Sequence, residues 1–350
     1  MLRELRVRDF RCFESLVFQP APGLNFIIGP NAQGKTSILE AACILLRLQS
    51  PKATSLGETV RFEQPGFGLD GHWNDRHLQV KIAGGTKSFT LDSKPQTKGA
   101  DYLSVARVVW IGNDDLQLVR GSGSGRRRYL DFLGAQIEPG YLRRLRAYER
   151  AVRSRNALLK DNRPRREIAA FDGPLIEAGS ALLESRARLI AGLTPKIADS
   201  YTQISGGREE LLITYQPGAV GDFAEALAAS RAEETRLRVT TVGPHRDDFD
   251  IQLGNHPADT FASEGQQRSI ALALKLGQAS ELGASTAEPP LYLIDDVFGE
   301  LDRDRRNNLM RALPDHAQKL ITSTTLNWRE ETTTATVFHL KEGLLSTEIS

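Results

Sequence analysis

Residues 29–36 read Gly29-Pro30-Asn31-Ala32-Gln33-Gly34-Lys35-Thr36, and this stretch decides the fold. It matches the pattern of Gly, four residues, Gly, Lys and then Ser or Thr that marks a phosphate-binding loop. A short apolar segment, residues 24–28, precedes it, and a segment rich in helix formers, residues 37–48, follows it. A strand, a glycine-rich loop and a helix in this order predict an α/β nucleotide-binding fold.

The same loop predicts the contacts that would hold a nucleotide. Glycines let backbone N–H groups turn toward phosphate, and the following helix presents the positive end of its dipole. Lys35 is placed to neutralise the β- and γ-phosphates, and the Thr36 hydroxyl to coordinate Mg²⁺. The expected cofactors are therefore ATP and Mg²⁺, with contacts from Gly29, Asn31, Gln33, Gly34, Lys35, Thr36 and Ser37.

A second motif, residues 291–296, is an apolar run that ends in two carboxylates, Asp295 and Asp296. The run predicts a buried parallel strand, and ligands gather at the carboxyl ends of such strands. Taken alone, the two acids would as often be a solvated strand end. Together with the phosphate loop, they predict that Asp295 holds Mg²⁺ and that Asp296 orients or polarises the water that attacks the γ-phosphate. ATP hydrolysis is the expected reaction, with Lys35, Asp295 and Asp296 as its catalytic residues.

A third motif, Ser263-Glu264-Gly265-Gln266-Gln267-Arg268, opens a helix-prone run that continues to Glu281. A serine hydroxyl and the unpaired N–H groups of a helix start form a second anion-binding site. By itself the pattern is more often that of an ordinary helix cap before a surface helix. One ATP has too few phosphates to need both loops within one subunit.

The charge of the chain is concentrated in one segment. The net charge is only +1, yet residues 121–170 contain 13 Arg or Lys and 5 Asp or Glu. Such a basic segment binds a polyanion by counterion release, with little dependence on base sequence, although charge runs are often solvated faces or networks of ion pairs. The arginines expected to contact DNA are Arg126, Arg127, Arg128, Arg143, Arg144, Arg146, Arg150 and Arg153.

Spacing predicts how the chain is organised. Between Thr36 and Ser263 lie 226 residues, too few for a long coiled-coil rod. Apolar residues with three-four spacing predict two helices around residues 141–159 and 175–189, with Pro164 between them. We therefore expect two parts of an ATPase lobe, residues 1–120 and 236–350, around a mainly helical lobe at residues 121–235. A flexible hinge is expected at residues 121–125, Gly-Ser-Gly-Ser-Gly.

Composition excludes several classes of protein. Hydrophobic residues make up 40% and charged residues 25% of the chain, and no apolar run approaches the roughly 20 residues that span a bilayer. The N-terminus lacks the apolar stretch of a secretory signal, so a cytoplasmic protein without a membrane partner is expected. Cys12 and Cys43 are too few for a zinc cluster or a disulfide framework.

His245, Arg246, Asp247 and Asp248 combine residue types found in hydrolase sites. No second cluster of carboxylates and histidines with metal spacing accompanies them. A structural role at the start of a hairpin is the preferred interpretation, with a lobe-linking or DNA-facing role as the alternative.

Five segments together resemble the bacterial RecF family, the recombination-mediator relatives of the SMC and Rad50 ATPase heads. The resemblance is specific at residues 243–249, 263–275 and 295–302 and weak at residues 50–100. The five segments are LRVRDFRCF (5–13), NAQGKTSILEAA (31–42), GPHRDDF (243–249), SEGQQRSIALALK (263–275) and DDVFGELD (295–302).

The resemblance implies an ABC-type ATPase head, a mixed sheet with helices, that dimerises on ATP and hydrolyses it slowly. It implies that Ser263, Gly265, Gln266 and Asp302 act on the nucleotide held by the partner subunit. It also implies binding to gapped or junction DNA and help in loading RecA together with RecR and RecO. In that family a glutamine senses Mg²⁺; the candidates for this role here are Gln117 and the nearby Asp114 and Asp115.

Two departures from the wider superfamily bear on catalysis. Thr322, Ser323 and Thr324 stand where transporter ATPases usually have a histidine that senses the γ-phosphate. Asp296 is shorter than the usual Glu, which is consistent with slow turnover. The alternative functions are the ATPase subunit of a transporter, disfavoured by the basic helical insert, and a defence ATPase with an attached nuclease, disfavoured by the missing metal cluster.

Overall fold

The structure, a computed structural model, describes residues 1–97, 99–207, 209–286, 288–326 and 334–349. The chain divides into two units, Met1–Asp115 with Leu282–Ser350, and Leu116–Glu281. None of the described helices is long and apolar enough to cross a bilayer.

The first unit contains a six-stranded mixed sheet with the order β15-β14-β3-β13-β12-β8. Five of these strands are parallel, and β15 pairs antiparallel with β14. The four strands β3, β13, β12 and β8 are buried along their whole length, as expected for parallel strands covered on both faces. The strands are β3 (Leu24–Ile28), β8 (Val108–Gly112), β12 (Leu291–Asp295), β13 (Lys319–Ser323), β14 (Thr336–Lys341) and β15 (Leu344–Ile349).

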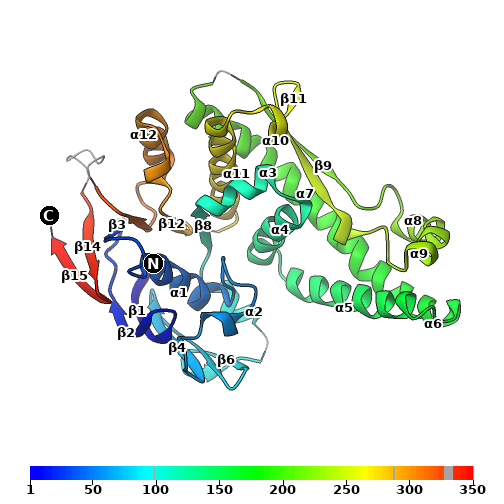
Figure 1. Ribbon diagram of the computed structural model, residues 1–350, viewed down its shortest axis with the longest axis horizontal. Coiled ribbons are helices and arrows are strands. Elements are labelled where there is room, and N and C mark those ends of the chain that lie inside the picture. Colours follow the sequence, from blue (N-terminus) through cyan, green and yellow to red (C-terminus); the bar gives the residue numbers. More distant parts are fainter. Residues whose placement is uncertain (98, 208, 287, 327–333, 350) are drawn as a thin grey trace. The chain divides into compact units, whose positions relative to one another are not determined.

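A second sheet of this unit is antiparallel, with the order β2-β1-β4-β5-β6-β7. Helix α1 (Lys35–Arg47) contacts strands of both sheets and is buried along most of its length, so it forms the core between them (Figure 1). The strands are β1 (Leu2–Phe10), β2 (Phe13–Phe18), β4 (Gly66–Trp73), β5 (Arg76–Ala83), β6 (Thr86–Leu91) and β7 (Lys94–Pro95). Shorter elements are η1 (Leu56–Thr59), α2 (Ala100–Ser104), η2 (Asn113–Leu116), η4 (Phe298–Glu300) and α12 (Arg303–Ala312).

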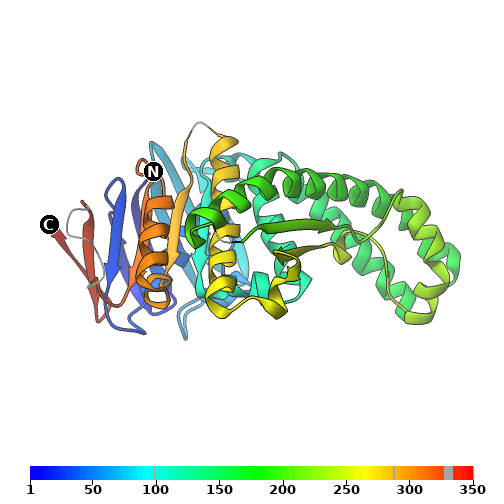
Figure 2. The same cartoon turned by 90° about the horizontal axis from the view of Figure 1, so that it is seen from above.

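The second unit is mainly helical and includes the expected pair of antiparallel helices. Helices α5 (Tyr141–Lys160) and α7 (Asp172–Ser205) pack along each other (Figure 2), and Pro164 precedes the short helix α6 (Arg165–Ala169) between them. The other helices are α3 (Gln117–Arg120), α4 (Gly123–Ile137), α8 (Phe223–Ala229), α9 (Arg231–Leu237), η3 (Pro244–Arg246), α10 (Ala258–Phe261) and α11 (Glu264–Ala284). A three-stranded sheet, β11-β10-β9, completes the unit with β9 (Leu211–Gln216), β10 (Asp248–Leu253) and β11 (His256–Pro257).

The second boundary between units differs from the expected one. The sequence predicts a helical lobe that ends at residue 235, whereas the compact unit extends to Glu281. The reason is long-range strand pairing, because β10 forms a ladder with β9, and β9 packs on α7. A pattern of helix-forming residues does not show which lobe a later strand joins.

The expected hinge at residues 121–125 is also corrected, because α4 begins at Gly123 and includes Gly125. A Cβ atom at Gly123 would lie 2.6 Å from Asp248 Oδ2. Gly123 therefore permits the close approach of α4 to β10 and belongs to a helix, not to a flexible hinge.

Candidate functional site

The phosphate loop links β3 to α1 in the geometry that its sequence predicts. Gly34 has a φ of +98°, and a Cβ atom there would lie 2.5 Å from Cys12 Sγ and 2.7 Å from Phe13 Cζ. Glycine is thus required at this position both for the backbone and for the space. Lys35 Nζ donates to the carbonyls of Gly29 at 2.6 Å and Pro30 at 2.8 Å. The ammonium group therefore lies within the turn of the loop.

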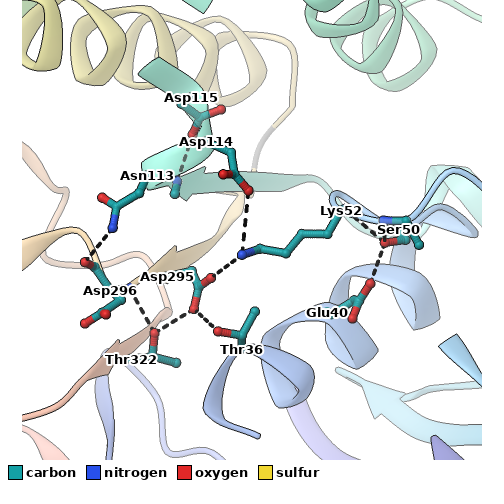
Figure 3. A network of polar contacts seen from close by, with 12 residues as sticks. Thr36, Glu40, Ser50, Lys52, Asn113, Asp114, Asp115, Asp295, Asp296 and Thr322 are labelled. Atoms are coloured by element: carbon teal, nitrogen blue, oxygen red, sulfur yellow. Dashed lines mark hydrogen bonds and ion pairs between the residues drawn. The ribbon is translucent and has the colours of Figure 1, made fainter. Parts of the chain in front are cut away.

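The carboxylate of Asp295 lies against the end of this loop (Figure 3). Its Oδ1 accepts hydrogen bonds from the hydroxyls of Thr36 at 2.7 Å and Thr322 at 2.9 Å. The side chain of Asp295 is only 5% exposed. The start of α1 and the ends of β12 and β13 thus contribute to one polar cluster, although Thr36 and Asp295 are 259 residues apart in the sequence. The hydroxyl of Thr322 holds Asp295.

Asp296 lies at the same end of β12 in a left-handed conformation, with a φ of +54°. Its N–H donates to Thr322 Oγ1 at 3.0 Å, and its carbonyl accepts from Asn113 Nδ2 at 3.3 Å. Burial raises the pKa of Asp296, Lys35 opposes this rise, and Asp295 adds to it. Hydrogen bonds of its N–H and carbonyl therefore hold Asp296 in the left-handed conformation, which costs a non-glycine residue a small amount of conformational free energy.

The phosphate loop, Asp296 and Thr322 border a cavity of about 510 Å³. This volume lies within the range of small-molecule sites. Burial lowers the pKa of Lys35, while the carboxylates of Asp296 and Asp295 oppose the effect. The cavity is lined by Arg11, Cys12, Asn31, Ala32, Gly34, Lys35, Thr36, Ser37, Glu58, Val60, Asp296 and Thr322.

Two cations near the cavity were not among the residues expected from the sequence. Arg11, at the turn between β1 and β2, pairs with both oxygens of Glu40 at 2.8 Å. Lys52, in the segment after α1, pairs with Asp295 Oδ2 at 3.0 Å and Asp114 Oδ2 at 3.7 Å. Arg11 falls within a segment that carries the family resemblance, but Lys52 has no local pattern that marks it.

Asp114 and Asp115, two candidates for sensing the metal, differ in their contacts. Asp114 pairs with Lys52, and its side chain is 82% exposed. Asp115 accepts a hydrogen bond from Gly112 N at 2.8 Å and thereby caps the end of β8. The third candidate, Gln117, begins α3 in the second unit.

In the second unit, Ser263 caps helix α11. Ser263 Oγ accepts from Gln266 N at 3.3 Å, and Ser263 N donates to Gln266 Oε1 at 2.7 Å, which is a reciprocal capping box. Gln266 Nε2 also donates to Glu209 Oε2 at 2.7 Å. Ser263 is exposed. The structure thus shows a well-formed helix start whose serine faces solvent, followed by Gly265 in the first turn.

Asp302 has a similar role in the first unit, where it caps α12. Its Oδ1 accepts from Arg305 N at 2.9 Å, and this hydrogen bond lowers the pKa of Asp302. The side chain is 51% exposed and also pairs with the guanidinium of Arg305. The carboxylate therefore stays ionised at a solvent-facing helix start.

The segment of residues 243–248 forms a buried structural network in the second unit. Asp247, which is fully buried, pairs with Arg186 at 2.7 Å, and the same guanidinium pairs with Asp131 at 2.8 Å. His245 Nδ1 contacts Tyr148 Oη at 2.6 Å, and burial lowers the pKa of His245. Among the described residues, no group of three or more His, Cys, Asp or Glu side chains could hold a metal ion. These contacts agree with the structural interpretation of this segment.

The eight arginines expected to contact DNA fall into two groups. Arg126 pairs with both oxygens of Asp248 at 2.5 and 2.9 Å, and Arg127 donates to Asp247 O at 2.7 Å. Arg144 pairs with Glu138, and Arg153 lies 3.9 Å from Glu149. The second group is exposed and makes no hydrogen bond or ion pair within the described parts of the chain; it consists of Arg128, Arg143, Arg146 and Arg150.

Comparison with known proteins yields one consistent result. Residues 4–119 match a family model described as an AAA domain. The DNA replication and repair protein RecF of Synechocystis sp. is 36% identical over 93% of this chain and 92% of its own length. The RecF protein of Bacillus cytotoxicus is 32% identical over 99% of both chains.

Solved structures extend the comparison to the fold. A structure of the recombination mediator protein RecF with ATP in the RecFOR pathway superimposes with a TM-score of 0.90 at 26% identity, covering 99% of this chain and 97% of that one. An SMC head bound to the C-terminal winged-helix domain of ScpA gives a TM-score of 0.59 at 12% identity, covering 99% of this chain and 96% of that one. The expected ABC-type head with a mixed sheet is therefore confirmed.

Proposed function

The chain belongs to the RecF family of DNA replication and repair proteins, and on this basis we propose that it is an ATP-dependent DNA-binding ATPase whose nucleotide site is completed by a second copy. The observation that carries the proposal is the cluster of Lys35, Thr36, Asp295 and Thr322 at the carboxyl ends of parallel strands. An exposed helix start at Ser263 provides a second anion-binding surface.

The donor atoms at this cluster fit Mg²⁺. Thr36 Oγ1 and the carboxylate of Asp295 are oxygen ligands, which this ion prefers, and they lie within 2.7 Å of each other. These two residues would hold the ion, which supplies charge neutralisation at the phosphate oxygens when bound. The side chains of Asn31, Gln33 and Ser37 and the backbone at Gly29 and Gly34 would surround the phosphates.

The protein's own residues divide the remaining work. Lys35 would neutralise the phosphates, and the carboxylate of Asp296 would orient the attacking water and accept its proton. Ser263, Gly265, Gln266 and Asp302 would act on the nucleotide of the partner subunit. ATP would then hold two copies together, and slow hydrolysis would release them.

The DNA-binding surface is proposed on the exposed group of arginines. Arg128, Arg143, Arg146 and Arg150 keep their guanidinium groups available, whereas Arg126 and Arg127 are engaged in contacts within the unit. Arg144 and Arg153 have acidic neighbours and would contribute less. Binding to gapped or junction DNA, and help in loading RecA with RecR and RecO, complete the proposal, since the structural relative acts in the RecFOR pathway.

ATP is expected to convert the protein from a monomer to a dimer in gel filtration with Mg²⁺. Lys35→Ala should abolish this shift because it removes the ammonium group that faces the phosphates. Ser263→Arg should leave nucleotide binding within about twofold but prevent dimerisation, because a bulky cation replaces the small hydroxyl at the helix start. Binding of a fluorescent ATP analogue, measured on each variant, separates the two steps.

A matched control for Ser263→Arg is Ser122→Arg, since Ser122 is an exposed residue at the start of α4 in the same unit. This variant should dimerise as the wild type does. A wild-type protein whose elution volume is the same with and without ATP would contradict the shared site.

Replacing Arg143 and Arg146 together with Glu is expected to weaken DNA binding by about 100-fold at moderate salt. Both side chains would neutralise phosphates, so the slope of log K against log salt should fall by about 2. Fluorescence anisotropy with labelled gapped DNA over a salt series measures both quantities. The charge-matched control replaces Lys81 and Lys94, two exposed lysines of the first unit, with Glu. This double variant should have little effect on DNA affinity. Equal losses in the two double variants would indicate a general effect of charge and place the DNA elsewhere.

A further inference from the structure

The segment that follows α1 is held firmly against that helix. Ser50 Oγ donates to Glu40 Oε1 at 2.6 Å and accepts hydrogen bonds from Lys52 N at 3.0 Å and Ala53 N at 2.7 Å. Glu40 is only 2% exposed and also pairs with Arg11. The backbone of Lys52 is therefore anchored to a buried carboxylate, which limits where its side chain can reach.

The side chain of Lys52 lies at the carboxylate that is proposed to hold Mg²⁺ (Figure 3). Lys52 Nζ is 3.0 Å from Asp295 Oδ2, while the threonine hydroxyls occupy Oδ1. Burial lowers the pKa of Lys52, but nearby carboxylates, Asp295 first among them, together raise it by more, so the pKa lies above its ordinary value. Every oxygen of this buried carboxylate thus already has a partner within the protein.

We propose that Lys52 is a built-in counter-ion of the metal site, whose ammonium occupies the place beside Asp295 Oδ2 and yields it when Mg²⁺ and nucleotide bind. The inference rests on the proposed ATPase function and assigns Lys52 as a positioning residue. Two cations against one buried carboxylate repel each other, so the metal and the ammonium compete for Asp295. Without a metal, the ammonium neutralises Asp295 and reduces its repulsion of the phosphates.

Lys52 consequently reduces the difference in affinity between metal-free and metal-bound nucleotide. Asp114, at 3.7 Å, offers the ammonium a second carboxylate when it leaves Asp295. A side chain that shuttles between two acids makes nucleotide retention less steeply dependent on the concentration of free Mg²⁺.

The test compares the dissociation constant of a fluorescent ATP analogue measured in EDTA with the constant measured in Mg²⁺. In Lys52→Met the dissociation constant in EDTA divided by the constant in Mg²⁺ should rise by about tenfold. The reason is that the affinity falls by about threefold in EDTA and increases by about threefold in Mg²⁺. Lys52→Arg keeps the charge, so its ratio of dissociation constants should stay within about twofold of the wild-type ratio. Lys81→Met, a change at an exposed lysine of β5, should leave the ratio unchanged.

Trp110 provides a second measurement on the wild-type chain. Lys52 Nζ lies 5.9 Å from the centre of the Trp110 ring, so movement of the ammonium should change the indole emission when Mg²⁺ and ATP are added together. Trp110→Phe identifies the part of the signal that comes from this residue. This measurement does not depend on the folding of any Lys52 variant.

The possible results separate the inference from the proposed function. No nucleotide binding by the wild type in either buffer would overturn the proposed function and, with it, the role of Lys52. Binding with an unchanged or lower ratio in Lys52→Met, or with a Trp110 emission that does not respond, would overturn the counter-ion role alone. A raised ratio, rescued by arginine, would support it.

Discussion

Replacing Asp296 with Asn is expected to lower the rate of ATP hydrolysis by at least about 100-fold, while ATP-dependent dimers still form. The two side chains have nearly the same shape, but the amide cannot accept a proton from water. Asp296 lines the cavity and is held by backbone hydrogen bonds to Thr322 and from Asn113, so its backbone should not move. The proposed nucleotide contacts of Lys35 and Thr36 would remain, and binding should persist.

Phosphate release under steady-state conditions measures the rate, and gel filtration with ATP measures the dimer. The dimer of Asp296→Asn should persist longer than that of the wild type, because slow hydrolysis delays its dissociation. Asp315→Asn is a suitable control, since Asp315 is exposed in the same unit and lies outside the cavity. A hydrolysis rate within about threefold of the wild type would remove Asp296 from the catalytic role.

The largest effect on stability is expected for Arg186→Met, which should lower the free energy of unfolding by about 3–5 kcal/mol. The side chain of Arg186 is 2% exposed and pairs with Asp247 at 2.7 Å and Asp131 at 2.8 Å. It also donates to the carbonyl of Pro244 at 2.6 Å. Without the guanidinium, the carboxylate of Asp247 stays buried and loses its charged partner, which is the costly outcome for such a pair.

Arg188→Met is the matched control on the same helix. Its side chain is 62% exposed and pairs with Glu138 at 3.0 Å and Glu184 at 4.0 Å, so the change should cost less than about 1 kcal/mol. Urea denaturation followed by circular dichroism measures both variants. Equal midpoints for Arg186→Met and the wild type would show that the network of residues 243–248 does not stabilise the second unit, and would reopen a functional interpretation of His245.

The arginine-rich segment illustrates what charge counting misses. All eight candidate arginines look alike along the chain, yet Arg126 pairs with Asp248, which lies 122 residues later. Arg155, in the same segment, is buried between Asp172 and Glu234. Only the fold shows which guanidinium groups are consumed by distant acids and which remain at the surface.

Lys52 shows the same limit within the site. Its residue type and neighbours in sequence do not mark it, because its partner Asp295 is 243 residues away on β12. The division into units was likewise decided by pairing between β9 and β10, whose residues are over 30 positions apart.

The sequence by itself determined the phosphate loop, the acidic end of β12 and the helix start at Ser263. Each is a run of consecutive residues with a recognisable pattern, and the φ of Gly34 and the capping box of Ser263 are local consequences of that pattern. The tertiary structure alone decided that Thr322 and Lys52 share Asp295, that Arg186 neutralises Asp247, and which arginines face solvent. Ion pairing depends on distance in space, and the packing of strands and helices far apart in the chain sets that distance.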